Sequence, residues 1–181
     1  MAHINVPEGV PGIRSLVMFR PETGKPLYEL AQILLRNESP LTPAERELIA
    51  THVSNKNNCI FCMSSHAAAA RELFGDDRKV VDCVIEDVTT APLTPKMKAL
   101  LNIAGKVQQN GKLVTPDDVA EARKHGAEDR DIHDTVLIAA TFSMFNRYVD
   151  GLASYTPTDP KAYEEMGKRM STVGYALPKP A

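Results

Sequence analysis

Two cysteines and a histidine stand close together near the middle of the chain. Cys59 and Cys62 are separated by two residues, and His66 follows Cys62 by four. On a helix these positions are i, i+3 and i+7, so all three side chains project from one face. A thiol, a second thiol that can resolve it and a base on the same face are what reversible thiol oxidation requires.

Glu47 is the carboxylate best placed to serve this histidine. If the chain reverses near Lys56 and Asn57, Glu47 and His66 lie nine or ten residues on either side of the reversal. At about 1.5 Å of rise per residue, they come level on two antiparallel helices. A carboxylate there would hold one imidazole nitrogen and raise the basicity of the other.

The segments around these residues resemble a known family. The spacing of the four residues resembles the signature of AhpD-like alkylhydroperoxidases in the carboxymuconolactone decarboxylase superfamily. Eleven residues separate Glu47 from the pair Cys59-x-x-Cys62, and three more separate Cys62 from His66. Three further segments resemble the peroxidase-related branch of that family: Pro21–Gly24, Glu45–Ala50 and Asn146–Gly151. The resemblance extends over most of the chain, from about residue 10 to about residue 170.

The resemblance implies a thiol-dependent peroxidase that reduces alkyl hydroperoxides or hydrogen peroxide. Cys62 would attack the peroxide and become a sulfenic acid, and Cys59 would condense with it to form a disulfide. Glu47 and His66 would form the proton relay. One position departs from the family pattern, because Phe61 stands where the best-known members carry a histidine just before the second cysteine.

The resemblance also implies partners. The family assembles into homo-oligomers, so we expect a trimer or a hexamer. Its best-known members are reduced by a lipoylated protein, so a lipoylated or thioredoxin-like dithiol is the expected reductant. We expect no bound cofactor and no metal.

Two effects compete to decide which thiol attacks. The partial positive charge at the start of a helix beginning near Asn57 or Asn58 favours a thiolate at Cys59. The four-residue step to His66 instead gives Cys62 a general base. We assign the attack to Cys62, because a thiolate of very low pKa is also a poorer nucleophile.

Other interpretations of the same residues stay open. The pair could serve a disulfide reductase or redox sensor, and His66 with Glu47 could serve a decarboxylase-like lyase acting on a cyclic lactone. Cys59, Cys62, His66 and Cys83 could also bind zinc, although a zinc knuckle usually places its cysteine pair on a tight turn. Cys83 by itself reads as a small buried hydrophobe, and His52 as a surface residue.

Composition narrows the class of protein. The 181 residues suit one domain, and the hydrophobic and charged fractions, 43% and 24%, are ordinary for a soluble globular protein. A net charge of -2 gives no reason to expect nucleic acid or a membrane as partner. No apolar run is long enough to span a bilayer, and the first twenty residues lack the pattern of a signal peptide. We therefore expect a cytoplasmic protein, in which a Cys-x-x-Cys pair indicates redox or metal chemistry.

Thr-Pro pairs mark three helix starts. Thr42-Pro43, Thr94-Pro95 and Thr115-Pro116 each place a capping hydroxyl before a proline at the first helical position. Glu45 and Asp118 follow two of these caps by three residues, as in a capping box.

Apolar periodicity and breaker residues predict eight helices and no convincing strand. We expect helices over about 26–36, 43–55, 58–74, 77–85, 94–111, 115–125, 129–153 and 161–170. The fold class is therefore all-α, a single-domain helical bundle over residues 1–181 with its core at about 20–155. The proline-rich ends, Val6–Gly12 and Leu177–Ala181, read as an arm and a tail.

Overall fold

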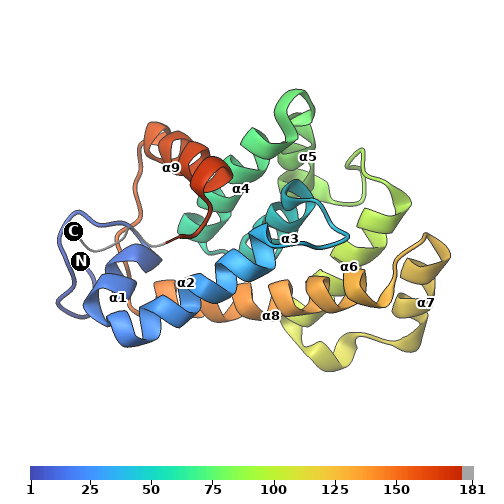
Figure 1. Cartoon of the computed structure of the whole chain (residues 1–181), viewed down its shortest axis with the longest axis horizontal. Helices are drawn as coiled ribbons and strands as arrows, with labels where there is room; N and C mark the ends of the chain where they lie inside the picture. Colours follow the sequence, from blue (N-terminus) through green and yellow to red (C-terminus); the bar gives the residue numbers. More distant parts are fainter. Residues whose placement is uncertain (177–181) are drawn as a thin grey trace.

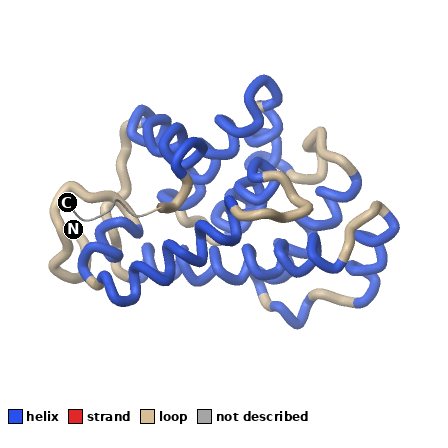
Figure 2. The backbone as a smooth tube through the Cα atoms, viewed as in Figure 1, coloured by secondary structure: helices blue, strands red, loops and turns tan. Residues whose placement is uncertain are grey.

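A computed structural model describes residues 1–176, so the tail expected over Leu177–Ala181 lies outside the described residues. Within residues 1–176 the chain forms helices and loops and no strand (Figure 2), which confirms the all-α class. The α-helices are α1 (Ile13–Phe19), α2 (Pro21–Arg36), α3 (Pro43–Lys56), α4 (Ile60–Phe74), α5 (Lys79–Asp87), α6 (Pro95–Gln109), α7 (Pro116–Lys124), α8 (Asp129–Gly151) and α9 (Pro160–Val173). Two single 3-10 turns, η1 (Gly75–Asp77) and η2 (Gly111–Leu113), follow α4 and α6.

The capping residues begin the helices that the sequence assigns to them. At the start of α3, Thr42 Oγ1 accepts a hydrogen bond from the backbone N–H of Glu45, and Glu45 accepts one from the backbone N–H of Thr42. The same reciprocal pair begins α7, and Thr94 caps α6. These hydrogen bonds satisfy N–H groups that the first turn of a helix leaves without partners.

Two predictions about the N-terminal region are wrong. Helix α1 is not expected from the sequence, and α2 begins at Pro21 rather than near Pro26. Pro21 takes the first helical position itself, so Pro26 lies inside α2. A proline there removes one backbone donor, and the packing of the helix outweighs that local cost.

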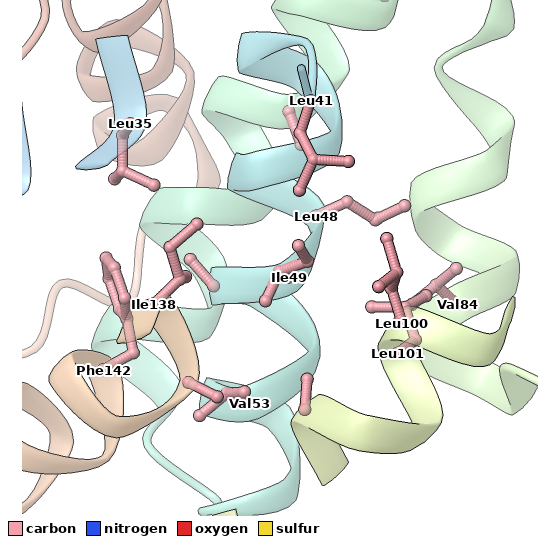
Figure 3. Packing of buried hydrophobic residues seen from close by; sticks show 14 of the residues in the cluster. Leu35, Leu41, Leu48, Ile49, Val53, Val84, Leu100, Leu101, Ile138 and Phe142 are labelled. Carbon is pink, nitrogen blue, oxygen red and sulfur yellow. The ribbon is translucent and has the colours of Figure 1, made fainter. Parts of the chain in front are cut away.

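The core surrounds α3. Leu48, Ile49 and Val53 of this helix are fully buried. Figure 3 shows them between side chains of the helices on either side, with Ile138 and Phe142 of α8 to one side and Leu100 of α6 to the other. In Figure 1, α8 lies along one long edge of the molecule, and α9 lies beside α4. Helix α3 is thus held from several sides, which fixes the position of every side chain that it carries.

His52 lies in this interior, not on the surface as the sequence suggests. Its side chain is 5% exposed, on the side of α3 that faces α6. Burial and the neighbouring Lys56 lower its pKa to about 4 from an ordinary value of 6.5. Because folding favours the neutral imidazole, protonation of His52 opposes folding as the pH falls from 6.5 towards about 4.

Helix α9 approaches α4 at a glycine. A Cβ atom added at Gly167 would lie 2.7 Å from both the carbonyl carbon and the Cβ of Ala68. Only a residue without a side chain allows the two helices to come this close.

No helix within residues 1–176 combines the length and the apolar character needed to cross a bilayer.

We predict that Gly167→Ala destabilises the protein, although alanine is the better helix former. The added methyl group meets backbone atoms of α4 that cannot move aside independently, at a cost of about 1–3 kcal/mol. Gly151→Ala, in the last turn of α8, is the matched control because nothing lies within 4 Å of its added Cβ. It should be neutral or stabilise by up to about 1 kcal/mol. Urea unfolding measures both, and equal effects would contradict the close approach.

Candidate active site

Glu47 of α3 and His66 of α4 meet across the antiparallel helix pair, as the counting argument expects. Nδ1 of His66 lies 2.7 Å from Oε2 of Glu47. The Glu47 side chain is fully buried, and that of His66 is 10% exposed. Since an ionised carboxylate can only accept, Nδ1 of His66 donates this hydrogen bond and Nε2 is left as the basic nitrogen.

The carboxylate of Glu47 has two more donors, which the sequence does not reveal. Nη2 of Arg36, at the end of α2, lies 2.5 Å from Oε1 of Glu47. The hydroxyl of Tyr175, which follows α9, donates to the same oxygen at 2.7 Å and lies 3.1 Å from Nδ1 of His66. Four elements distant in sequence therefore converge on one buried carboxylate.

The electrostatics favour an ionised Glu47. Burial alone would raise the pKa of Glu47, but His66, Arg36 and the Tyr175 hydroxyl outweigh it, so the pKa lies below its ordinary value. Burial beside this anion raises the pKa of Tyr175 well above 10.0, so the phenol stays protonated and donates. Arg36 supplies a positive charge beside this anion, which compensates the burial of the carboxylate.

Tyr175 is held at both ends. Its backbone N–H donates to Oε1 of Gln32 at 2.7 Å, and the guanidinium carbon of Arg36 lies 5.2 Å from the centre of its ring. The ring also stacks with the imidazole of His66 at a centroid distance of 6.0 Å. These contacts tie the segment after α9 to α2 and α4 at the site itself.

The two cysteines occupy the start of α4, but not as the sequence places them. Cys59 is the N-cap residue before the helix rather than a member of its first turn. Its backbone N–H donates to the carbonyl oxygen of Ser54 at 3.0 Å, and Asn58 before it takes a φ of 56°. Asparagine is among the few residues that adopt this left-handed conformation readily.

Polar side chains hold the turn that presents Cys59. Nδ2 of Asn57 donates to Oδ1 of Asn146 on α8 at 2.8 Å, and Nδ2 of Asn146 donates to Oγ of Ser54 at 3.0 Å. Nε2 of Gln108 on α6 donates to Oδ1 of Asn57 at 2.9 Å. Asn146 therefore joins the turn to the longest helix of the molecule.

The thiols lie in a small apolar cluster of their own. Cys59 is fully buried and Cys62 is 4% exposed, and both pack with Phe61 and Val149. A hydrogen bond to Cys62 and then burial raise the pKa of Cys59 far above its ordinary value. Cys83 is also a free thiol, but it packs against the main core instead.

His66 borders a cavity of about 120 Å³. Its polar lining includes His66, Tyr175 and Ser65, and most of the remaining lining is apolar. Neither cysteine belongs to that lining. His66 therefore borders the cavity while it follows Cys62 by one turn of α4, a step that places Cβ atoms about 5–6 Å apart.

The expected site residues thus form two groups, and the members of each group contact one another. Glu47 and His66 form one hydrogen-bonded group, and Cys59 and Cys62 form the other. Cys83 joins neither group, so the four side chains of the zinc interpretation do not converge. Sequence reasoning missed Arg36, which reads as an ordinary cation at a helix end, and Tyr175, which has no spacing signal.

Comparison with known proteins identifies the family of this chain. A model of the carboxymuconolactone decarboxylase family matches residues 21–106. The crystal structure of an uncharacterised peroxidase-related protein from Silicibacter is 30% identical, with a TM-score of 0.77 over 86% of this chain and 79% of that one. The chain belongs to the carboxymuconolactone decarboxylase superfamily.

Two further proteins are also similar to this chain, one in its fold and the other in part of its sequence. The crystal structure described as the alkylhydroperoxidase AhpD core, an uncharacterised peroxidase-related protein from Ralstonia eutropha, has a TM-score of 0.81 at 24% identity over 92% of this chain and 96% of that one. YdfG, an uncharacterised protein of Bacillus subtilis, is 26% identical over 110 residues, 61% of this chain and 74% of that protein. The similarity to the AhpD core establishes the helical architecture.

We predict that the buried carboxylate of Glu47 makes the free energy of unfolding depend on pH in the acid range. Because folding lowers the pKa of Glu47 below 4.5, its ionised form stabilises the fold above that pH, and this contribution is lost as the pH falls through the folded pKa. Tyr175→Phe removes one donor to Glu47, so it should lower the free energy of unfolding by about 1.5–3 kcal/mol at neutral pH. It should also raise the pH at which stability begins to fall on acidification. Glu47→Gln should cost about 3 kcal/mol or more and remove this part of the acid dependence.

Urea unfolding from about pH 7 to about pH 3 measures these effects. Tyr28→Phe is the matched control, since Tyr28 lines the same cavity but its hydroxyl makes no hydrogen bond within residues 1–176. If Tyr175→Phe behaves like Tyr28→Phe, the hydroxyl of Tyr175 does not stabilise Glu47.

Proposed function

We propose that this protein is a thiol-dependent peroxidase that uses Cys59 and Cys62 as a dithiol and His66 with Glu47 as a proton relay. The observation that carries the proposal is the buried hydrogen bond between His66 and Glu47 beside a buried Cys-x-x-Cys pair. That bond leaves Nε2 of His66 basic, one helical turn from Cys62. Membership of the carboxymuconolactone decarboxylase superfamily and the similarity to a peroxidase-related protein support the same activity.

The chemical steps follow from the two groups. His66 takes the proton of Cys62, whose thiolate attacks the terminal peroxide oxygen, so that an S–O bond forms and the O–O bond breaks. The alkoxide leaves as an alcohol when His66 returns the proton, and Cys62 is oxidised to a sulfenic acid. Cys59 then displaces water from that sulfur to form a disulfide, which an external dithiol reduces.

The assignment of Cys62 as nucleophile is supported by the thiols themselves. Hydrogen bonding with Cys62 and burial in the apolar cluster both raise the pKa of Cys59. A thiol that donates a hydrogen bond stabilises the thiolate that accepts it. The raised pKa of Cys59 opposes the preference of a helix N-terminus for a thiolate at that position.

The remaining expectations form part of the proposal. Phe61 replaces the histidine of the best-known members and is nearly buried beside Tyr163 and Ile13, so we assign no proton transfer to this position. We propose that the protein acts as a homo-oligomer, a trimer or hexamer, with a lipoylated or thioredoxin-like dithiol as reductant and no bound cofactor. A cycle that starts from free thiols suits the cytoplasm.

We predict distinct outcomes for the site variants. Cys62→Ser should abolish peroxide consumption and leave no sulfenic acid to trap, whereas Cys59→Ser should react once and stop with a trappable sulfenic acid at Cys62. His66→Ala and Glu47→Gln should slow the first step by about 10²–10⁴-fold, with Glu47→Gln the milder, and together by less than the product of their effects. Stopped-flow peroxide consumption and mass spectrometry after dimedone trapping measure these outcomes.

Cys83→Ser is the matched control for the cysteines, and it should leave the rate and the disulfide between Cys59 and Cys62 unchanged. If Cys59→Ser eliminates the first turnover while Cys62→Ser spares it, the roles are reversed. A disulfide that includes Cys83 would contradict the site as proposed.

One observation favours a second candidate, a lyase that acts on a cyclic lactone. The cavity presents His66 and Tyr175 to a ligand but no thiol, which suits acid–base chemistry without cysteine. The double variant Cys59→Ser/Cys62→Ser separates the two, because it should retain lactone decarboxylation if the lyase is correct and lose peroxide consumption if the peroxidase is correct.

A further inference from the structure

We propose that the cavity beside His66 binds a small organic hydroperoxide that carries a carboxylate, and that Arg14 and Arg169 bind this carboxylate. The inference deepens the proposed peroxidase function by naming the chemical class of the substrate. It rests on that function only for the reaction, and not for binding.

The size and lining of the cavity limit the apolar part of the ligand. An apolar cavity of about 150 Å³ accommodates benzene, so a cavity of about 120 Å³ suits a chain of about five carbon atoms. Leu27, Phe142 and Met166 are among the apolar side chains that line it. A long acyl chain does not fit within this volume.

Two arginines provide positive charge where the cavity opens. Arg14 of α1 and Arg169 of α9 both line the cavity and are both solvent-exposed, so they mark its mouth. Burial raises the pKa of Tyr28, which also lines the cavity, while Arg169 and Arg14 both act to lower it. The two guanidinium groups therefore lie close to the same phenol.

Neither arginine has an acidic partner that would explain its position. Within residues 1–176 no carboxylate pairs with Arg14 or Arg169, and Arg169 donates only to the carbonyl oxygen of Ala176, at 3.3 Å. Guanidinium groups bind carboxylates through paired hydrogen bonds. An apolar cavity with two guanidinium groups at its mouth thus fits an amphipathic anion better than a neutral molecule.

The cavity lies next to the reacting groups. Ile13, Phe61 and Met166 line it and also pack against the cluster of Cys59 and Cys62, so they form a wall that the two regions share. His66 borders the cavity at its inner end, with Tyr175 beside it. A ligand whose carboxylate lies at the mouth would carry its other end towards His66, which follows Cys62 by one turn of α4.

Equilibrium dialysis tests binding without turnover. The probes are hexanoate and hexan-1-ol with the reduced wild-type protein. Hexanoate should bind more tightly than hexan-1-ol. Arg14→Gln/Arg169→Gln should raise the Kd for hexanoate about three- to tenfold and change the Kd for hexan-1-ol little, because partly exposed ion pairs contribute modestly to binding. Lys25→Gln/Lys168→Gln removes two exposed charges from α2 and α9 outside the cavity lining, so it should bind hexanoate as the wild type does.

Turnover provides the second measurement. The ratio of kcat/KM for a hydroperoxide of hexanoate to that for its methyl ester should exceed one in the wild type and fall about three- to tenfold in Arg14→Gln/Arg169→Gln. If no peroxide at all is consumed, the proposed function fails, while dialysis still decides the carboxylate site. Equal binding of hexanoate and hexan-1-ol, or the same loss in Lys25→Gln/Lys168→Gln, would overturn the inference.

Discussion

The carboxylate of Glu47 is the constraint on which the site depends. A fully buried negative charge is costly unless donors and a positive charge surround it, and here Arg36, His66 and Tyr175 do so. Each donor comes from a different element, so satisfying one charge fixes α2, α3, α4 and the segment after α9 relative to one another. The same hydrogen bonds fix which nitrogen of His66 is basic, so one network serves both stability and chemistry.

The packing of the helices explains why this network can be so compact. Apolar residues of α3 hold that helix between α6 and α8 (Figure 3), while Gly167 lets α9 lie directly on α4. Helix α9 in turn carries Met170, whose carbonyl oxygen accepts hydrogen bonds from Nε and Nη2 of Arg36. The guanidinium group of Arg36 is thereby oriented by the backbone of α9 and forms its ion pair with Glu47 of α3. These contacts leave it little freedom to pair with another carboxylate.

Local signals predicted much of this architecture, and nonlocal contacts explain the rest. The Thr-Pro caps located three helix starts, and the distance of Glu47 and His66 from a single chain reversal predicted their contact, because both depend on neighbouring residues and on regular helical rise. Tyr175 could not be found this way, since it reaches His66 from 109 residues away with no regular spacing between them. Burial of His52 is equally nonlocal, because α6 covers it.

The position of Cys59 just outside α4 has a thermodynamic consequence for the proposed cycle. Because Cys59 precedes α4, the nearest backbone that can adjust when a bond to Cys62 forms is that of Asn57 and Asn58, which lies outside both α3 and α4. The Asn57–Asn146 hydrogen bond stiffens that turn. Stiffness there changes the free-energy difference between dithiol and disulfide, which is the reduction potential. Asn146 of α8, through its hydrogen bond to Asn57, would thus influence the reduction potential of the proposed disulfide.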